Sequence, residues 1–155
     1  MRPWCSHGLA VVLMAGALAA GLTITPAVCP GEVFAQEGAV QLNKEGLQAY
    51  QAGKLEEAKD LFLKAVKADP SNAKFWTNLG LALRQLDRPR EAAVAYRRAN
   101  QAQPDYALAY KNLGVALEKL GDNNGAAEAY RKYCELAPEA PDAASVKAWA
   151  ENLIK

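Results

Sequence analysis

The sequence predicts an all-α protein built of three helical hairpins in a row, closed by one further helix. The first observation behind this prediction is an internal repeat, because Pro70, Pro104 and Pro138 follow one another at a constant interval. Within each 34-residue unit, apolar residues recur at the spacing of two amphipathic helices. The composition, with 51% hydrophobic and 23% charged residues, is that of a folded domain. The same interval separates the members of three further sets: Gly46, Gly80 and Gly114; Ala58, Ala92 and Ala126; and Phe62, Tyr96 and Tyr130.

Residues 1–35 are predicted to be a secretory signal peptide. Arg2 precedes an uncharged apolar run at residues 9–22, and the small residues Val33 and Ala35 fit a cleavage site before Gln36. The run is shorter than the roughly 20 residues that a membrane-spanning helix needs. We therefore expect a periplasmic or secreted protein whose mature domain is residues 36–155.

Three alternatives remain at the N-terminus. Cleavage could follow Ala27, or residues 9–29 could stay uncleaved as an anchor in the inner membrane, since no charge lies between Arg2 and Glu32. A lipoprotein signal at Cys29 fits poorly, because Val28 precedes the cysteine where a small residue is required. Only in the uncleaved case do we expect membrane association.

The repeats are predicted at residues 39–72, 73–106 and 107–140. In the middle unit a break at Asp87–Pro89 separates the two helices, and Pro104 ends the second, because proline clashes with a continuing helix. Gly80 and Ala92 are small, and we expect the two helices of the unit to cross closely at them. The apolar faces are Trp76, Leu79, Gly80 and Leu83 in the first helix, and Ala92, Ala95, Tyr96 and Ala99 in the second.

The outer units depart from this pattern. The first unit has Leu42 and Glu45 where the middle unit has Trp76 and Leu79, which is expected of an atypical terminal repeat. The third unit has Tyr133 and Gly125 at places that hold Ala65 or Ala99, and Glu57 or Glu91, in the other units. These two differences predict a less regular second helix in the third unit.

Residues 142–154 are predicted to form a capping helix over the apolar edge of the third unit. Asp142 is a suitable N-cap residue. Trp149 is expected to be buried against the second helix of that unit. The apolar face of the capping helix comprises Val146, Trp149, Ala150 and Leu153.

The spaced pattern Trp76-x2-Leu79-Gly80-x2-Leu83, followed by Ala92-x3-Tyr96, Ala99 and Pro104, resembles the tetratricopeptide repeat, and the resemblance extends over residues 39–140. It implies a right-handed superhelical α-solenoid that binds a peptide segment of a partner protein. In this family the first helix of each unit lines a concave groove. The family's clamp for a C-terminal carboxylate is not carried over, because Asn43, Leu108 and Asn112 stand where it needs basic residues.

The family's groove positions, carried onto this sequence, hold basic residues from all three units and a single acidic one, Glu118. This balance predicts an acidic peptide as the partner. Asn78 and Asn112 are expected to be exposed and to bind its backbone, while Leu47, Leu81 and Val115 form an apolar floor. The groove residues so predicted are Asn43, Lys44, Leu47, Lys74, Asn78, Leu81, Arg84, Lys111, Asn112, Val115 and Lys119, and Val40, Tyr50, Gln51, Thr77, Gln85, Leu108 and Glu118 share the same positions.

Several function classes are excluded by composition. The net charge of +1 gives no electrostatic footprint for nucleic acid. The predicted mature chain lacks histidine, because the only one is His7, so its serines, threonines and thiol have no histidine base and we expect no catalysis, metal or cofactor. The remaining thiol, Cys134, is expected to be buried and structural. The alternative function is structural, with the ends of the array pairing to form a homo-oligomer.

Overall fold

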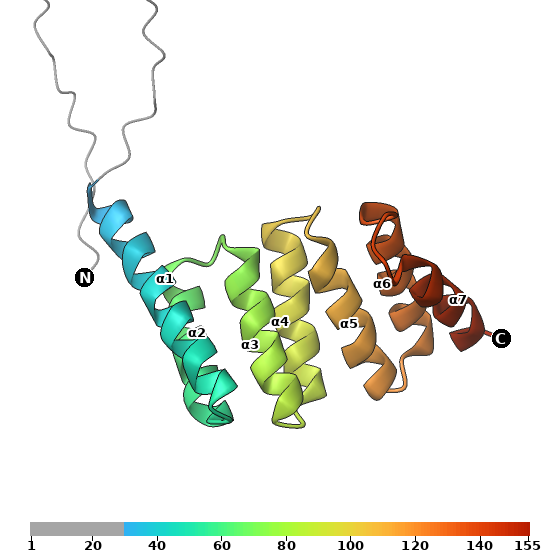
Figure 1. Cartoon of the computed structure of the whole chain (residues 1–155), viewed down its shortest axis with the longest axis horizontal. Coiled ribbons are helices and arrows are strands. Elements are labelled where there is room, and N and C mark those ends of the chain that lie inside the picture. The colour runs from blue at the N-terminus through green and yellow to red at the C-terminus, as the bar shows by residue number, and fades with distance from the viewer. Residues whose placement is uncertain (1–29) are drawn as a thin grey trace, which may run out of the picture.

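The computed structural model describes the backbone from residue 30 and the side chains from residue 37 to Lys155. This part of the chain forms seven helices and no strand, which confirms the all-α prediction, and Figure 1 shows the helices following one another along an elongated array, with α1 overlapping α2 and α7 overlapping α6 in this view. The helices are α1 (Pro30–Gln51), α2 (Leu55–Ala68), α3 (Ala73–Gln85), α4 (Pro89–Ala102), α5 (Ala107–Lys119), α6 (Asn123–Leu136) and α7 (Ala143–Leu153).

Three antiparallel hairpins, α1–α2, α3–α4 and α5–α6, stack in order, and α7 packs on α6. The first helices of the hairpins (α1, α3 and α5, the A helices) also contact one another in sequence. Within the described residues, the backbones of the second helices (α2, α4 and α6, the B helices) lie further from one another than those of the A helices. The array is therefore tighter along its A helices, which places them on its concave side.

Small residues let the two helices of each hairpin cross closely. A Cβ atom at Gly80 would lie 2.5 Å from the Tyr96 ring, and one at Gly114 would lie 2.5 Å from the Tyr130 ring. Ala92, predicted at the same crossing, has no exposed surface. The repeated glycine and alanine thus make room for the repeated aromatic ring, which fills the core of each hairpin.

The A-to-B turns also repeat. Gly53, Asp87 and Gly121 hold the same place in successive units and all have positive φ, at 74°, 58° and 78°. Such a left-handed residue commonly ends a helix, and glycine adopts it without steric strain. Asp87 is the unusual member of the set, and Pro89 follows it at the start of α4, where its fixed φ suits a first helical position.

The second helix of the third unit, α6, is a continuous helix of 14 residues, so the expected irregularity is wrong. Asp122 caps it by accepting a hydrogen bond of 3.0 Å from the backbone N–H of Gly125. A Cβ at Gly125 would lie 2.5 Å from the Asp122 carboxylate. Glycine at this position therefore accommodates the cap.

The capping helix α7 packs on α6 with Asp142 at its N-cap position, as expected, but the predicted burial of Trp149 is wrong. Ala143 and Ala150 are buried and Val146 and Leu153 partly so, whereas Trp149 is 52% exposed. Trp149 points toward α5 instead, where its indole N–H bonds a carboxylate. Asp142 precedes the helix but makes no capping hydrogen bond with its side chain, because that side chain is engaged elsewhere.

The predicted signal peptide and its alternatives fall mainly on residues 1–29, which lie outside the described residues. Helix α1 begins at Pro30 and so includes the predicted cleavage site before Gln36. Within the described residues, none of the helices has the length and apolar character needed to cross a membrane.

Candidate peptide-binding groove

The floor of the concave side is apolar where α1 meets α3. Leu47 is 38% exposed and Leu81 is partly buried, so both present apolar surface to solvent. Between them is a small hollow of about 50 Å³. The residues that line it are Leu47, Tyr50, Phe62, Asn78 and Leu81. The structure therefore brings together predicted groove residues from two units.

Helix α7 extends this floor by one more helix. Leu47, Leu81 and Val115 hold the same place in successive units, and Trp149 continues the series at the same interval. The Trp149 Nε1–H donates a 3.0 Å hydrogen bond to Oε2 of Glu118, a predicted groove residue on α5. Helix α7 thus follows α6 as the A helix of a fourth unit would, and its Trp149 side chain bonds Glu118 of α5. The sequence indicates this position for Trp149, because the repeat period continues to it. The prediction from the amphipathic pattern of α7 instead placed the indole ring in the core.

The asparagines differ from the sequence prediction. The Asn78 side-chain amide donates a 2.8 Å hydrogen bond to Oδ1 of Asn43, which joins α3 to α1, and Asn112 is only 8% exposed. The expectation that both amides are exposed is therefore wrong. Replacing them would disturb packing as well as binding. Thr77 is also absent from the groove surface, since it is buried and its hydroxyl donates to the carbonyl of Ala73.

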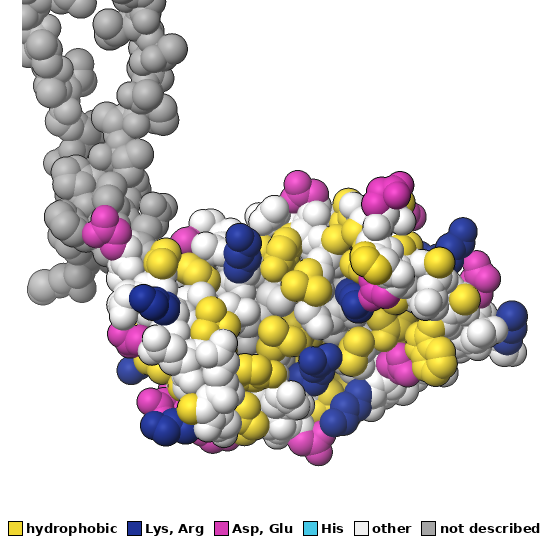
Figure 2. All heavy atoms as spheres, in the orientation of Figure 1, with side chains coloured by type: hydrophobic (Ala, Val, Ile, Leu, Met, Phe, Trp, Pro, Cys, Tyr) yellow, Lys and Arg dark blue, Asp and Glu magenta, His cyan; other side chains and the backbone are white. Residues whose placement is uncertain are grey.

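The basic residues on α1 and α3 are free of acidic partners. Lys44 and Lys74 are exposed and Arg84 is partly buried, and none of them forms an ion pair with a carboxylate among residues 37–155. Figure 2 shows one face of the array, on which hydrophobic side chains form a band across successive helices with Lys and Arg side chains among them. Among the described residues, no carboxylate neutralises the positive charge at this end of the predicted groove.

The basic residues on α5 are neutralised within the protein. Lys111 pairs with Asp142, and Lys119 pairs with Asp87 at 2.5 Å. Among the predicted groove residues of α5, the remaining charged one is Glu118, which accepts a hydrogen bond from Trp149. The predicted set of groove cations is therefore divided: the α1–α3 half is cationic, and the α5–α7 half is aromatic with a negative charge.

Asp142 connects three helices. Its carboxylate accepts hydrogen bonds from Lys111 of α5 and from the Tyr133 hydroxyl of α6, the latter at 2.5 Å. The Lys111 ammonium also lies 5.4 Å from the centre of the Tyr133 ring. Tyr133 stands where the other units have Ala65 and Ala99. Its departure from the repeat is explained by this contact, which fastens the start of α7 to the third unit.

This contact predicts a pH dependence of stability. The hydrogen bond from Lys111, and to a lesser extent the one from Tyr133, lowers the pKa of Asp142. The hydrogen bond to Asp142 also raises the pKa of Tyr133 to about 12. Because the folded-state pKa of Asp142 is the lower one, the carboxylate stabilises the fold above the ordinary Asp pKa of about 4 and less as the pH falls below it. Asp142→Asn should therefore be less stable than the natural protein at pH 7, and the difference should disappear on acidification.

Urea unfolding measured between neutral pH and about pH 2.5 checks this expectation. Asp105→Asn is the matched control, because Asp105 is exposed at a turn and belongs to none of the ion pairs among residues 37–155. A difference between Asp142→Asn and the natural protein that stays constant with pH would contradict the role given to the carboxylate.

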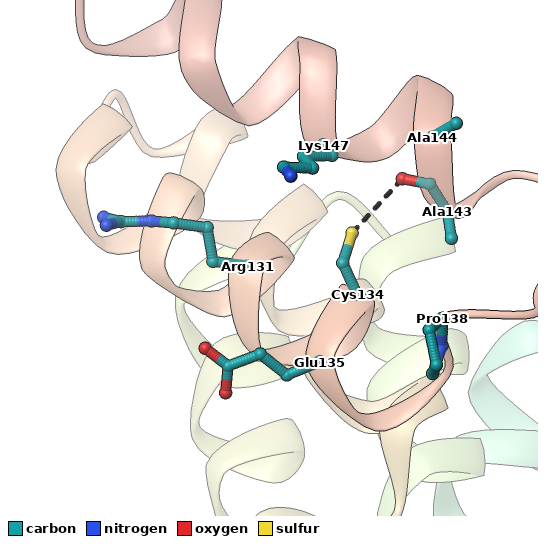
Figure 3. A pocket seen from close by; sticks show the side chains of 7 residues that line it. All are labelled: Arg131, Cys134, Glu135, Pro138, Ala143, Ala144 and Lys147. Atoms are coloured by element: carbon teal, nitrogen blue, oxygen red, sulfur yellow. Dashed lines mark hydrogen bonds between the residues drawn. The ribbon is translucent and has the colours of Figure 1, made fainter.

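The thiol lies away from the groove. Cys134 is partly buried at a hollow of about 470 Å³ between α6 and α7 (Figure 3), and it donates a 3.3 Å hydrogen bond to the carbonyl of Ala143. Burial raises the pKa of the thiol, which keeps it protonated and a poor nucleophile. In the described part of the chain, no group of His, Cys, Asp and Glu side chains could hold a metal ion. Cys134 therefore has a packing role, although it is less buried than predicted.

Solved structures share this arrangement. The first repeat domain of Spaghetti (RPAP3), bound to the HSP90 peptide SRMEEVD, is 26% identical with a TM-score of 0.72, over 77% of this chain and 94% of that one. The Arabidopsis OM64 repeat domain is 22% identical with a TM-score of 0.71, over 76% of this chain and 98% of that one. MamA is 28% identical with a TM-score of 0.68, over 75% of this chain and 63% of that one. No curated protein sequence matches significantly.

The family assignment comes from the sequence profile of the tetratricopeptide repeat, which matches residues 43–106 and 82–141. Together the two matches run through all three hairpins and cover more than half of the chain. They agree with the repeat period, the glycine crossings and the row of A helices. The chain therefore belongs to the tetratricopeptide repeat family, and it is a non-catalytic protein-interaction module.

Proposed function

We propose that the protein is an exported adaptor or assembly factor that binds an acidic peptide segment of a partner protein in its concave groove. The observation that carries this proposal is the apolar floor between Leu47 and Leu81, flanked by three cations that pair with no carboxylate among residues 37–155: Lys44, Lys74 and Arg84. Apolar contacts would supply most of the affinity, and the cations would select for carboxylates and speed association. The repeat domain of Spaghetti, which was solved with a bound peptide, supports the same use of the fold.

The groove is long enough to define a peptide length. Neighbouring helices pack about 8–10 Å apart, so the row from α1 to α7 spans roughly 30 Å. An extended peptide rises about 3.3 Å per residue, so about ten residues would cross the groove. We expect their acidic side chains over α1 and α3, because Glu118 repels them at the other end.

Charge-removing variants test the groove. The purified protein is first used to select acidic peptides of about twelve residues from a random display library, which covers the expected length. Lys74→Gln with Arg84→Gln should weaken the selected peptide about five- to tenfold and reduce its sensitivity to salt, since two ion pairs are lost. Fluorescence polarisation of the labelled peptide at several salt concentrations measures both effects.

The matched control removes the same number of positive charges from a surface outside the groove. Lys64→Gln with Lys67→Gln removes two exposed charges from α2, a B helix outside the groove. It should leave the affinity of the peptide nearly unchanged. Equal weakening by both pairs would mean that only net charge matters, and the groove would then not be the recognition surface.

Export rests on the apolar run at residues 9–22 and the small residues before Gln36. We expect the mature protein to begin at Gln36 and to be found in the periplasm or outside the cell. Intact-mass measurement of the chain recovered from each cell fraction tests this proposal. A full-length chain in the membrane fraction would instead support the anchor.

A structural role is the second candidate, and the exposed apolar surface of Ile154 at the end of α7 favours it. In that case the ends of two arrays would pair. Light scattering on the dilute protein separates the candidates, because a monomer excludes a homo-oligomeric structural role.

A further inference from the structure

Two buried side-chain atoms, the Tyr96 hydroxyl oxygen and Oδ1 of Asn100, have no hydrogen-bond partner among the described residues, and Tyr96 belongs to the hydrophobic core. The Tyr96 side chain has no exposed surface, and its hydroxyl forms no hydrogen bond with any described residue. Buried hydroxyls are ordinarily paired, because an unpaired one loses its bonds to water without replacement. The Tyr96 hydroxyl therefore needs an explanation that packing alone does not give.

The third unit shows how the same position is satisfied. Tyr130 is the counterpart of Tyr96, and each ring packs against the glycine of its A helix in the same way, Tyr96 on Gly80 and Tyr130 on Gly114. The Tyr130 hydroxyl donates a 3.0 Å hydrogen bond to Oε2 of Glu118, one helical turn beyond Gly114. The position thus places a phenol hydroxyl where a groove carboxylate can accept from it.

In the middle unit the carboxylate is replaced by a cation. Arg84 holds the place in the second unit that Glu118 holds in the third, one turn beyond Gly80. A guanidinium group has only donors, so it cannot accept a hydrogen bond from Tyr96. Burial raises the pKa of the Tyr96 hydroxyl, so the phenol stays protonated and keeps its hydrogen-bond donor. The Tyr96 hydroxyl forms no hydrogen bond with Arg84 or any other described residue, so its proton has no acceptor at the place where Tyr130 has Glu118.

We propose that Arg84 and the Tyr96 hydroxyl form a subsite for one carboxylate of the bound peptide. The proposal rests on the peptide-binding function above and fixes which α3 residues receive an acidic group. The incoming carboxylate takes the place that Glu118 has beside Tyr130, with one oxygen accepting from the hydroxyl and the charge pairing with Arg84. Because the hydroxyl is sealed from solvent in the free protein, groove side chains such as the flexible Arg84 must shift as the carboxylate enters.

A cycle of single-atom changes tests the subsite. Tyr96→Phe removes only the hydroxyl oxygen, and Glu→Gln or Asp→Asn at each acidic place of the library-selected peptide removes one carboxylate at a time. A peptide with an amidated C-terminus distinguishes a terminal carboxylate from a side chain. In the full chain, Tyr96→Phe should lower the affinity for the parent peptide about tenfold. It should not lower the affinity for the peptide variant whose substitution removes the carboxylate that the subsite binds.

Tyr130→Phe is the matched control, because its hydroxyl is already bonded to Glu118. Tyr130→Phe should not change the affinity for the peptide. Tyr96→Phe should not lower the melting temperature, because the hydroxyl that it removes has no hydrogen bond in the free protein. If binding requires Lys74 and Arg84 but is the same in Tyr96→Phe, the groove function stands and the subsite is wrong. If no acidic peptide is selected at all, both proposals fail.

Discussion

Removal of residues 142–155 should destabilise the protein by about 3–5 kcal/mol and expose the apolar edge of α6. Helix α7 covers that edge with Ala143 and Ala150, which are buried, and with Val146 and Leu153, which are partly so. At about 0.8 kcal/mol per buried CH₂ group, their loss accounts for a reduction of this size. The deletion also removes Asp142. The expected loss is a large share of the roughly 5–15 kcal/mol by which domains are ordinarily stable.

Chemical unfolding followed by circular dichroism, together with light scattering, measures this loss. Because each unit of a repeat array contacts only its neighbours, the third hairpin should open first and the unfolding transition should broaden. Ile154→Ala is the control within the same segment, because Ile154 is 51% exposed and should contribute little. A truncated protein that melts as the natural one does and stays soluble would show that α7 is not a cap.

Local sequence patterns predicted much of this fold because each pattern occurs three times, once in every unit. The glycine at 46, 80 and 114, with the aromatic ring at 62, 96 and 130, specifies the helix crossing in every hairpin. Proline at 70, 104 and 138 marks the ends of the units. Helix type, hairpin order and the cap follow from these positions and from hydrophobic periodicity alone.

The groove was less predictable, because its properties depend on contacts between helices that are distant in sequence. Lys119 and Asp87 belong to different units, and nothing local indicates that they pair. Asn112 sits at a groove position, yet the neighbouring helices bury it. Trp149 has an apolar ring that the amphipathic pattern assigns to the core, although its N–H bonds Glu118. A periodicity pattern indicates which residues share a helix face. Which of these residues are buried depends on how the neighbouring helices pack against that face.

Gly80→Ala should lower the free energy of unfolding by about 1–3 kcal/mol, the usual range for overpacking a core. Two effects oppose each other at this position. Alanine favours the helical backbone over glycine by about 1 kcal/mol, but its Cβ would lie 2.5 Å from Cε1 of Tyr96 and 2.7 Å from Cζ. The Tyr96 ring is fully buried, so it has no free space into which to withdraw. We expect the steric effect to be the larger.

Gly38→Ala separates the two effects, because Gly38 lies within α1 and a Cβ there would meet nothing within 4 Å. In the full chain, where α1 begins at Pro30, that variant should be more stable than the natural protein by up to about 1 kcal/mol, from helix propensity alone. The two variants make the same chemical change, but their expected effects on the free energy of unfolding have opposite signs. Urea unfolding measures both effects. If the clash causes the loss, Gly80→Ala should cost little more when Tyr96 is already Leu, since the smaller side chain leaves room for the methyl group. An equal cost in both backgrounds would place the strain in the α3 backbone and not at its crossing with α4.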